Sequence, residues 1–131
     1  MNIIRWVIEG QLARGRRPGY SEKDNIMKVE VDDWINEVKS LGIKSIICFL
    51  DDELSFYGKI PGGLLNYYRE KGFEVEHIPV KDHKCPALSK EEEKMTGEAY
   101  VKLPKPVLVH CSAGVDRTGL AVEYLQTLIL K

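Results

Sequence analysis

The stretch CSAGVDR begins at Cys111 and ends at Arg117, so that five residues separate a thiol from a guanidinium. Three of the five are the small residues Ser112, Ala113 and Gly114. Small residues allow a backbone to curl until successive N–H groups point to one centre, which forms an anion-binding nest. An arginine beside such a nest can bind two oxygens of a phosphate at once. The stretch therefore predicts a phosphate site with a sulfur nucleophile inside it.

The elements on either side of this stretch place it where ligands usually bind. The apolar run 107–109 predicts a strand before Cys111, and helical spacing begins near Arg117. In open α/β sheets, ligands bind beyond the carboxyl ends of the strands. At the first position of such a loop, the N–H groups and the helix dipole stabilise the thiolate form of cysteine. The arrangement suits covalent phosphoryl transfer.

Helix and strand patterns alternate along the rest of the chain. We expect helices over residues 31–41, 62–72, 89–103 and 117–131, and strands over residues 43–50, 73–80 and 105–110. Two short strands with a turn near Gly10 come before them, and Pro18 stops this regular structure. The alternation predicts one α/β domain over residues 1–131, with a mostly parallel central sheet, helices on both faces and a short N-terminal hairpin.

Two details of the helices are specific enough to compare with a structure. Ser89, followed three residues later by Glu92, predicts a capping box at the start of the third helix. In the last helix, the apolar spacing predicts inward-facing side chains at Leu120, Tyr124 and Leu128, together with Ala121 and Leu125.

The composition excludes several classes of function. The chain has 131 residues, 44% of them apolar, and a net charge of −1, which gives no overall basic field for nucleic acid. No apolar run approaches the ~20 residues that span a bilayer. The cysteines, Cys48, Cys85 and Cys111, are irregularly spaced, so neither a disulfide framework nor a zinc site is predicted. We expect a monomeric cytoplasmic protein without metal or cofactor, with no nucleic-acid partner and no membrane insertion.

The segment HCSAGVDRTG matches the signature HCxxGxxR(S/T)G of the cysteine-dependent protein tyrosine phosphatase superfamily. The chain resembles the compact, dual-specificity-like branch of that superfamily most closely. Three further segments carry the resemblance: RWVIEGQLARGRRPG is similar to the N-terminal hairpin, SIICFLDDEL to the strand that leads to an acidic turn, and IPVKDHKCP to the general-acid loop. The likeness covers most of residues 3–125 and implies a protein tyrosine phosphatase-like fold.

The resemblance implies a role for each residue of the signature. Cys111 is the nucleophile that becomes phosphorylated, and Arg117 binds the phosphoryl oxygens and stabilises the transition state. Thr118 donates a hydrogen bond to the sulfur in the second step, and His110 holds the loop and supports the thiolate. The implied phosphate-binding residues are Ser112, Ala113, Gly114, Val115, Asp116 and Arg117. No metal is implied, because Arg117 and the backbone N–H groups supply the charge.

Loss of an alkoxide or phenoxide needs a proton donor, and two aspartates are candidates. Asp82 follows the predicted strand 73–80, and the pair of Asp82 and Pro86 matches the acid loop of the family. Asp116 lies inside the loop, directly before the arginine, as it does in some relatives that act on phosphoinositides. Those relatives have lysine where this chain has Val115, so the likeness to them is partial. The choice between Asp82 and Asp116 stays open.

Other reactive or charged residues each have two interpretations. Cys48 is a core residue or a redox partner of Cys111, and Cys85 is a second candidate for such pairing. The run RGRR at 14–17 is either a solvated turn or a basic rim that attracts phosphorylated substrates. The two aspartates at 51–52 are interpreted as turn or substrate-side residues near the site.

These observations lead to one main functional hypothesis and two alternatives. The main hypothesis is a protein tyrosine or dual-specificity phosphatase that acts on a phosphorylated protein or another phosphomonoester through a phosphocysteine intermediate. One alternative keeps the chemistry and acts on phosphoinositides or RNA 5′-phosphates, and the other is a phosphate-binding module with weak catalysis. Relatives usually continue with further helices beyond the position of Lys131, so we expect those C-terminal helices to be short or missing.

Overall fold

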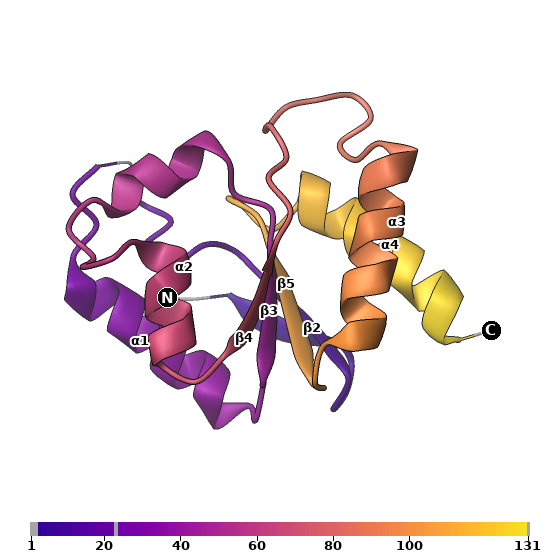
Figure 1. Ribbon diagram of the computed structural model, residues 1–131, viewed down its shortest axis with the longest axis horizontal. Helices are drawn as coiled ribbons and strands as arrows, with labels where there is room; N and C mark the ends of the chain where they lie inside the picture. The colour runs from indigo at the N-terminus through magenta and orange to yellow at the C-terminus, as the bar shows by residue number, and fades with distance from the viewer. Residues whose placement is uncertain (1–2, 23, 131) are drawn as a thin grey trace.

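The computed structural model describes residues 3–22 and 24–130. Its elements follow the order β1 (Ile4–Ile8), β2 (Leu12–Gly15), α1 (Lys28–Ser40), β3 (Ser45–Cys48), the 3-10 helix η1 (Asp52–Tyr57), α2 (Leu64–Glu70), β4 (Glu74–His77), α3 (Lys90–Lys102), β5 (Val107–His110) and α4 (Asp116–Ile129) (Figure 1). The predicted alternation of helices and strands is confirmed.

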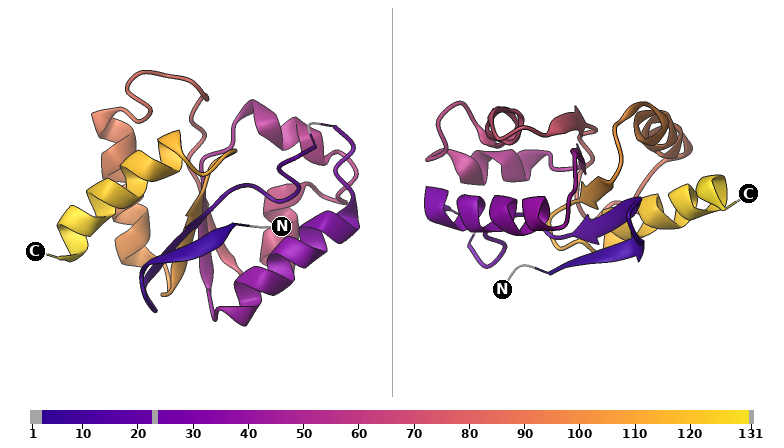
Figure 2. Two further views of the ribbon diagram at one scale, coloured as in Figure 1. Left: turned by 180° about the vertical axis from the view of Figure 1, so that it is seen from behind. Right: turned by 90° about the horizontal axis from the view of Figure 1, so that it is seen from below.

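A five-stranded sheet runs through the middle of the molecule in the order β1-β2-β5-β3-β4. Strands β1 and β2 form an antiparallel hairpin, and every other neighbouring pair is parallel. Figures 1 and 2 show α1 and α2 on one face of the sheet and α3 and α4 on the other. The predicted fold class, a mostly parallel sheet covered on both faces and extended by an N-terminal hairpin, is confirmed.

The central strands β3 and β5 are buried along their whole length. Their sequences, SIIC and VLVH, are mostly apolar, as expected for parallel strands that are covered on both faces. They pair in register from Ser45 with Val107 to Cys48 with His110. Residues that follow the two strands therefore emerge side by side at one edge of the sheet.

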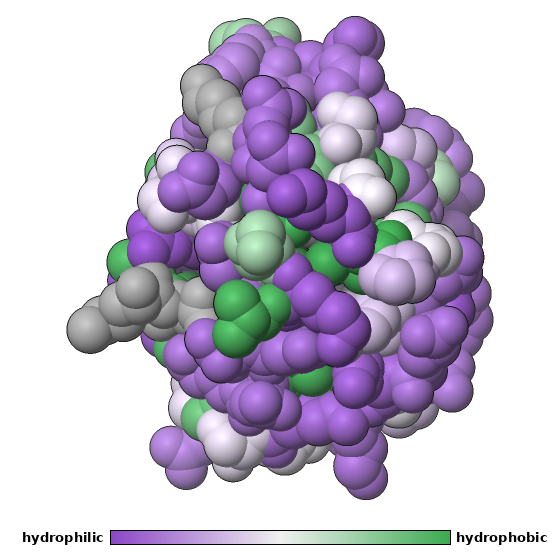
Figure 3. Space-filling model, turned by 90° about the vertical axis from the view of Figure 1, so that its left-hand side faces the viewer, coloured by the Kyte–Doolittle hydropathy of each residue, from purple (hydrophilic) through white to green (hydrophobic). Residues whose placement is uncertain are grey.

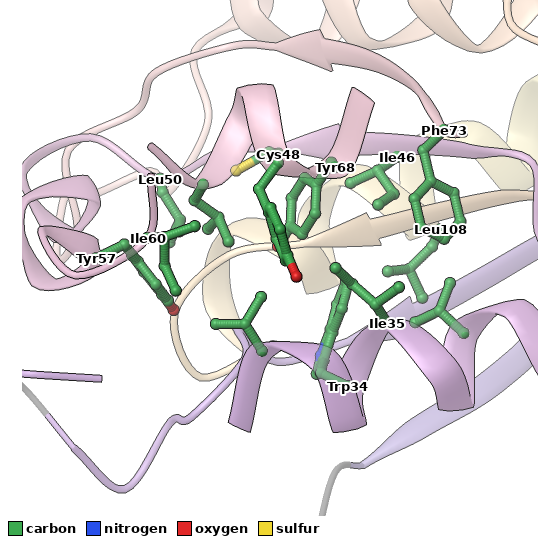
Figure 4. Packing of buried hydrophobic residues seen from close by; sticks show 14 of the residues in the cluster. Trp34, Ile35, Ile46, Cys48, Leu50, Tyr57, Ile60, Tyr68, Phe73 and Leu108 are labelled. Atoms are coloured by element: carbon green, nitrogen blue, oxygen red, sulfur yellow. The ribbon is translucent and has the colours of Figure 1, made fainter. Parts of the chain in front are cut away.

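The face under α1 and α2 is packed with aromatic and aliphatic side chains (Figure 4). The Trp34 ring stacks on the Tyr68 ring with centroids 5.4 Å apart, and its centroid lies 5.3 Å from that of the His110 ring. Trp34 also donates its indole N–H to the Arg16 backbone oxygen at 2.9 Å. This cluster ties the end of the hairpin to the residue that directly precedes Cys111.

Helix α4 buries only part of the predicted stripe, and the predicted burial of Ala121 and Leu125 is confirmed. Its buried residues are Arg117, Thr118, Ala121, Val122 and Leu125. The prediction was wrong for Leu128, which is 41% exposed, and Leu120 and Tyr124 are only half-buried. The buried Arg117 side chain fixes the rotation of the helix about its axis, and this rotation turns the Ala121 and Leu125 stripe inward.

Strand β4 ends at His77, before the predicted end at Val80. The backbone nevertheless continues beside β3, because the Ile78 N–H donates to the Cys48 oxygen at 3.0 Å and the Val80 N–H donates to the Phe49 oxygen at 3.1 Å. This extended stretch carries the chain from the sheet edge into the loop before α3.

Helix α3 begins with the predicted capping box. The Glu92 N–H donates to the Ser89 Oγ at 3.1 Å, and the Ser89 N–H donates to the Glu92 Oε1 at 2.8 Å. The loop before α3 therefore ends at a fixed point, since two backbone N–H donors at the start of the helix are satisfied there.

The side of the molecule that lies at the left in Figure 1 is mostly hydrophilic. Figure 3 shows its apolar residues as small, separate spots among the polar atoms. None of the helices in the described part of the chain combines the length and the apolar character that crossing a bilayer requires.

Candidate active site

The loop 111–115 joins β5 to α4 and is held by residues of the hairpin and the turn after it. Arg17 donates its backbone N–H to the Ser112 oxygen at 2.9 Å and its Nε to the Ser112 Oγ at 3.0 Å. Arg14 donates its Nη2 to the Gly114 oxygen at 2.9 Å. Two carbonyl oxygens of the loop are thus turned toward the hairpin, and Cys111 at the first position is only 2% exposed.

Gly114 is the one loop position where no other residue fits. Its φ is +76°, a backbone conformation that side chains with a Cβ rarely adopt. A Cβ on Gly114 would also lie 2.6 Å from the Gly15 backbone oxygen of β2. The glycine of the signature therefore serves the close approach between the loop and the hairpin.

Arg117 points its guanidinium into the sheet edge and is 1% exposed. Its Nη1 donates to the backbone oxygens of Phe49 at 3.1 Å and Val80 at 2.6 Å. Its Nη2 donates to the Glu53 Oε2 at 2.5 Å. The third nitrogen, Nε, is buried and has no hydrogen-bond partner among the described residues. The guanidinium is thus fixed along one side and has an N–H left for an anion.

Glu53 is a site residue that the sequence prediction missed. Its carboxylate is buried in the first turn of η1 and accepts the Asp51 backbone N–H at 3.0 Å in addition to the Arg117 bond. Burial alone would raise the pKa of Glu53, but these hydrogen bonds outweigh it and hold the pKa below the ordinary value. Glu53 is therefore ionised at neutral pH and balances the charge of Arg117.

The two aspartates before Glu53 were the residues that the prediction considered. The Asp52 side chain is 85% exposed and lies 3.6 Å from the Lys81 Nζ, on the outside of the turn. A pattern of three consecutive acids does not reveal which one turns inward, because a 3-10 turn places successive side chains about a third of a turn apart.

His110 is fully buried behind the loop. Its Nδ1 lies 3.0 Å from the Cys111 backbone oxygen, and its Nε2 lies 2.9 Å from the Tyr68 hydroxyl. Because a carbonyl oxygen only accepts, Nδ1 carries the proton and Nε2 accepts the Tyr68 hydrogen. Burial lowers the pKa of His110 to about 4, so the ring is neutral at pH 7. These bonds link the first loop residue to the aromatic cluster.

Thr118 is fully buried one residue after Arg117. Its Oγ1 has no hydrogen-bond partner within the described part of the chain, and the hydrogen bond to the Cys111 sulfur in the second step stays a prediction. The Thr118 hydroxyl and the Arg117 Nε are thus both buried without a hydrogen-bond partner, and they belong to adjacent residues. Such unpaired buried polar atoms are few in folded proteins.

A cavity of ≈ 490 Å³ opens over the loop and brings both candidate acids to Cys111. The residues that line it include Cys111, Ser112, Asp82 and Asp116. The Asp82 Oδ1 lies 3.5 Å from the Arg117 Nη2 and also accepts the backbone N–H of the following residue at 3.0 Å. Asp116 is exposed at the first residue of α4. The structure therefore places one acid against the guanidinium and the other at the rim.

The cysteines outside the loop occupy very different surroundings. Cys48 is fully buried in the cluster under α1 and α2, and this burial raises the pKa of its thiol to about 12. Cys111 belongs to the cluster on the opposite face of the sheet. Cys85 is exposed in the loop between β4 and α3, and all three thiols are free. The core interpretation of Cys48 is confirmed.

The run at 14–17 contains a residue that fits neither of its two interpretations. Arg17 is 2% exposed, so it is not part of a solvated turn or an open rim. Besides its bonds to Ser112, it donates to the Tyr57 hydroxyl at 3.4 Å and to the backbone oxygens of Gly19 at 3.4 Å, Tyr20 at 3.1 Å and Glu22 at 2.8 Å. Nothing in the sequence distinguishes it from Arg14 and Arg16, which lie within three residues of it.

Metal-binding side chains do not gather at this edge. Among residues 3–22 and 24–130, no group of three or more His, Cys, Asp or Glu residues is placed to hold a metal ion. One arginine, Arg17, lines the cavity, and the Arg117 guanidinium lies behind its wall in contact with Glu53 and Asp82.

Solved structures with the same fold are phosphatases by name. The kinase associated phosphatase, with its catalytic-site cysteine replaced by serine, is 27% identical with a TM-score of 0.67 over 90% of this chain and 65% of its own. The core catalytic domain of the PP-IP phosphatase SIW14 from S. cerevisiae is 19% identical, with a TM-score of 0.64 over 95% of this chain and 65% of its own. TpbA from P. aeruginosa, solved with pTyr, is 18% identical, with a TM-score of 0.54 over 92% and 60%.

The chain thus spans about two thirds of the length of these structures. A search of curated proteins by sequence finds no match. The family model Tc-R-P, described as "Polymorphic toxin system, DSP-PTPase phosphatase", matches residues 23–127, which include the loop, Asp82 and Arg117. The chain therefore belongs to the DSP-PTPase phosphatase family of polymorphic toxin systems.

Proposed function

We propose that the protein hydrolyses phosphomonoesters through a phosphocysteine intermediate, without a metal, as a protein tyrosine or dual-specificity phosphatase. One observation carries the proposal: the Arg117 guanidinium is buried beside the Cys111 loop, fixed by two carbonyl oxygens and Glu53, with its Nε left without a partner. A buried donor in a water-poor site stabilises transferred charge far more strongly than a solvated one.

In the first step, the Cys111 thiolate attacks the phosphorus, and the bond between phosphorus and the leaving oxygen breaks. The electron pair stays on the leaving oxygen, which takes a proton from Asp82. Arg117 and the loop N–H groups stabilise the charge on the three equatorial phosphoryl oxygens. Breaking the ester bond thus needs no metal ion.

In the second step, water attacks the phosphorus of the intermediate and the bond between sulfur and phosphorus breaks. The electron pair returns to the Cys111 sulfur, to which the Thr118 hydroxyl donates a hydrogen bond. The Asp82 carboxylate takes the proton of the attacking water, so the acid of the first step is the base of the second. The products are inorganic phosphate and the restored thiolate.

Asp82 is favoured over Asp116 as the acid by its position. Its carboxylate lies 3.5 Å from the Arg117 Nη2 at the wall of the cavity. Asp116 is exposed at the first residue of α4, at the rim of the cavity. Asp82 is therefore the candidate beside the group that binds the phosphoryl oxygens, where the leaving oxygen on the same phosphorus also lies.

An aryl phosphate is supported as substrate by the cavity wall. The rings of Tyr20 and Phe56 line the cavity together with Cys111 and can pack against a phenyl ring. TpbA, which shares the fold, was solved with pTyr. We therefore place phosphotyrosine first among the substrates to be tested.

The direct test is phosphate release from a phosphotyrosine peptide in a metal-free buffer, with the intact protein and with Cys111→Ser. Release by the first and none by the second is the expected result. Release that persists in a folded Cys111→Ser variant would overturn the proposal.

A matched pair identifies the acid. Asp82→Asn should slow release from the peptide but much less from p-nitrophenyl phosphate, whose leaving group needs little protonation, while Asp116→Asn should affect both substrates equally. The reverse pattern would make Asp116 the acid.

We extend the proposal to the domain organisation: residues 1–131 act as one phosphatase domain. Both hydrophobic clusters share the same sheet, and the hairpin contacts the loop directly. A single cooperative unfolding transition, seen alike by circular dichroism and tryptophan fluorescence, is the expected result.

A further inference from the structure

A second cavity, of ≈ 360 Å³, lies between the β1–β2 hairpin and the loop that carries Cys111. Arg5, Arg14 and Arg16 line it, and no acidic residue does. Tyr20 and Ala113 line both this cavity and the one over Cys111, so the two adjoin. A ligand that fills the first cavity can therefore extend into the second.

The arginines of the hairpin are arranged at a cost to the fold. Arg5 and Arg14 are direct cross-strand partners in the antiparallel pair. Like charges that face each other across two strands are destabilising. Within the described part of the chain, neither guanidinium lies within ion-pair distance of a carboxylate. A bound anion would remove this repulsion.

The electrostatics of Arg14 agree with this geometry. Its pKa is lowered, first by burial and then by the charge of Arg5, whereas Cys111 acts in the opposite direction. Its Nη2 already holds the Gly114 oxygen of the loop. The same side chain thus fixes the loop and adds positive charge to its outer side.

We propose that this cavity is a second anion subsite, which binds a further phosphate group of the substrate while Cys111 attacks the first. The substrate class is then a phosphomonoester that carries two or more phosphate groups on one small scaffold. The inference rests on the proposed phosphocysteine chemistry, and it places this class of substrate ahead of a phosphotyrosine protein. It also accounts for the apolar loop positions Ala113 and Val115, because the hairpin supplies the basic groups that the loop lacks.

The first experiment compares two inhibitors of p-nitrophenyl phosphate hydrolysis. Orthophosphate fits the Cys111 loop alone, whereas inositol hexakisphosphate presents phosphates in several directions and can reach both cavities. The measured quantity is the ratio of the two inhibition constants. Arg5→Gln should lower the preference for inositol hexakisphosphate about tenfold, the loss expected for one charge-assisted hydrogen bond.

Arg69→Gln is the matched control, since it removes the same charge from an exposed position on α2. Its inhibition ratio should equal that of the unmodified protein. An Arg5→Gln ratio equal to the control would overturn the subsite and leave the phosphatase proposal untouched.

A second experiment stays informative even if the protein hydrolyses nothing. In the Cys111→Ser background, inositol hexakisphosphate should raise Tm, and Arg5→Gln should reduce that rise. Without an anion, Arg5→Gln should have a Tm equal to or above that of its parent, because the cross-strand repulsion is gone. A lower Tm without anion and an unchanged rise with it would mean that Arg5 is only structural.

Phosphate release from two substrates separates the sources of such a phosphate. Inositol 1,4,5-trisphosphate represents a free sugar phosphate, and phosphatidylcholine vesicles that contain phosphatidylinositol 4,5-bisphosphate represent a lipid headgroup. If phosphate release from one of these substrates falls in Arg5→Gln but not in Arg69→Gln, the result supports the subsite. The substrate affected then shows whether the second phosphate comes from a free sugar phosphate or from a lipid headgroup. Release from both that is independent of Arg5 would overturn it.

Discussion

Arg17 and Arg117 are two buried guanidiniums that approach the same loop, from the turn after β2 and from the start of α4. They are 2% and 1% exposed. Arg17 bonds to Ser112, to the Tyr57 hydroxyl and to three backbone oxygens of its own turn, with no carboxylate partner in the described residues. Arg117 has Glu53 as a charge partner, and its Nε has no hydrogen-bond partner among the described residues.

The difference shows two ways in which a protein uses a buried cation. Carbonyl oxygens around Arg17 satisfy its hydrogen bonds and so fix the turn and the loop, but they leave nothing for a ligand. The ionised Glu53 holds Arg117 along one side and leaves an N–H for an oxyanion. The first arginine therefore contributes to stability and the second to binding and chemistry.

The largest expected effect concerns the chemistry. Arg117→Lys keeps the charge beside Glu53 but loses the planar fork, so kcat/KM for a phosphotyrosine peptide should fall by about 10³-fold, or about 4 kcal/mol. Its Tm should change little. If the variant retained most of the activity, the role of Arg117 in binding and chemistry would be refuted.

The next largest effect concerns stability. Arg17→Met leaves the Ser112 hydroxyl and the turn's carbonyl oxygens without donors, so the free energy of unfolding in urea should fall by about 3–4 kcal/mol. Arg69→Met, an exposed site, is the control and should stay within about 0.5 kcal/mol. Equal stabilities of the two variants would contradict the conclusion that the hydrogen bonds of Arg17 stabilise the turn and the loop.

The third prediction uses His110, whose pKa is lowered by burial and further by the charges of both Arg117 and Arg17. The unfolded chain binds more protons than the folded one between the pKa of about 4 and the ordinary value of 6.5. His110 therefore stabilises the fold fully above pH 6.5, and this contribution, on the order of 3 kcal/mol, is lost as the pH falls to about 4.

Proton NMR of the His110 ring checks this directly. No titration should appear above pH 5, and Arg17→Met should raise the pKa because one of the two charges is gone. A titration midpoint near 6.5 in the unmodified protein would refute the neutral, buried state.

The smallest effect tests the partner of Arg117. Glu53→Gln keeps a hydrogen-bond acceptor but removes the charge, so kcat/KM should fall about tenfold, or about 1.4 kcal/mol. Asp52→Asn is the same change at the neighbouring, 85% exposed side chain and should have no effect. If the two variants behave alike, the charge of Glu53 does not position Arg117.

The sequence was sufficient for the parts of the molecule that depend on local spacing. Along the chain, the spacing of apolar residues alternates between that of a helix and that of a strand. This alternation predicted the order of the elements, because each helix must bury one stripe and each strand one or both faces. The signature predicted where Cys111 and Arg117 would lie, since a strand, a tight loop and a helix leave few possible geometries. The capping box at Ser89 and Glu92 depends on neighbours three residues apart, and it was confirmed for that reason.

Only the tertiary structure decided which charged residues turn inward. Glu53 and Arg17 come from runs of similar residues, DDE and RGRR, in which neighbours became solvent-exposed or line a cavity. Their burial depends on partners 64 and 95 residues away, Arg117 and Ser112. The cost of burying a charge is met only when those distant groups arrive, so no local pattern in the sequence carries that information.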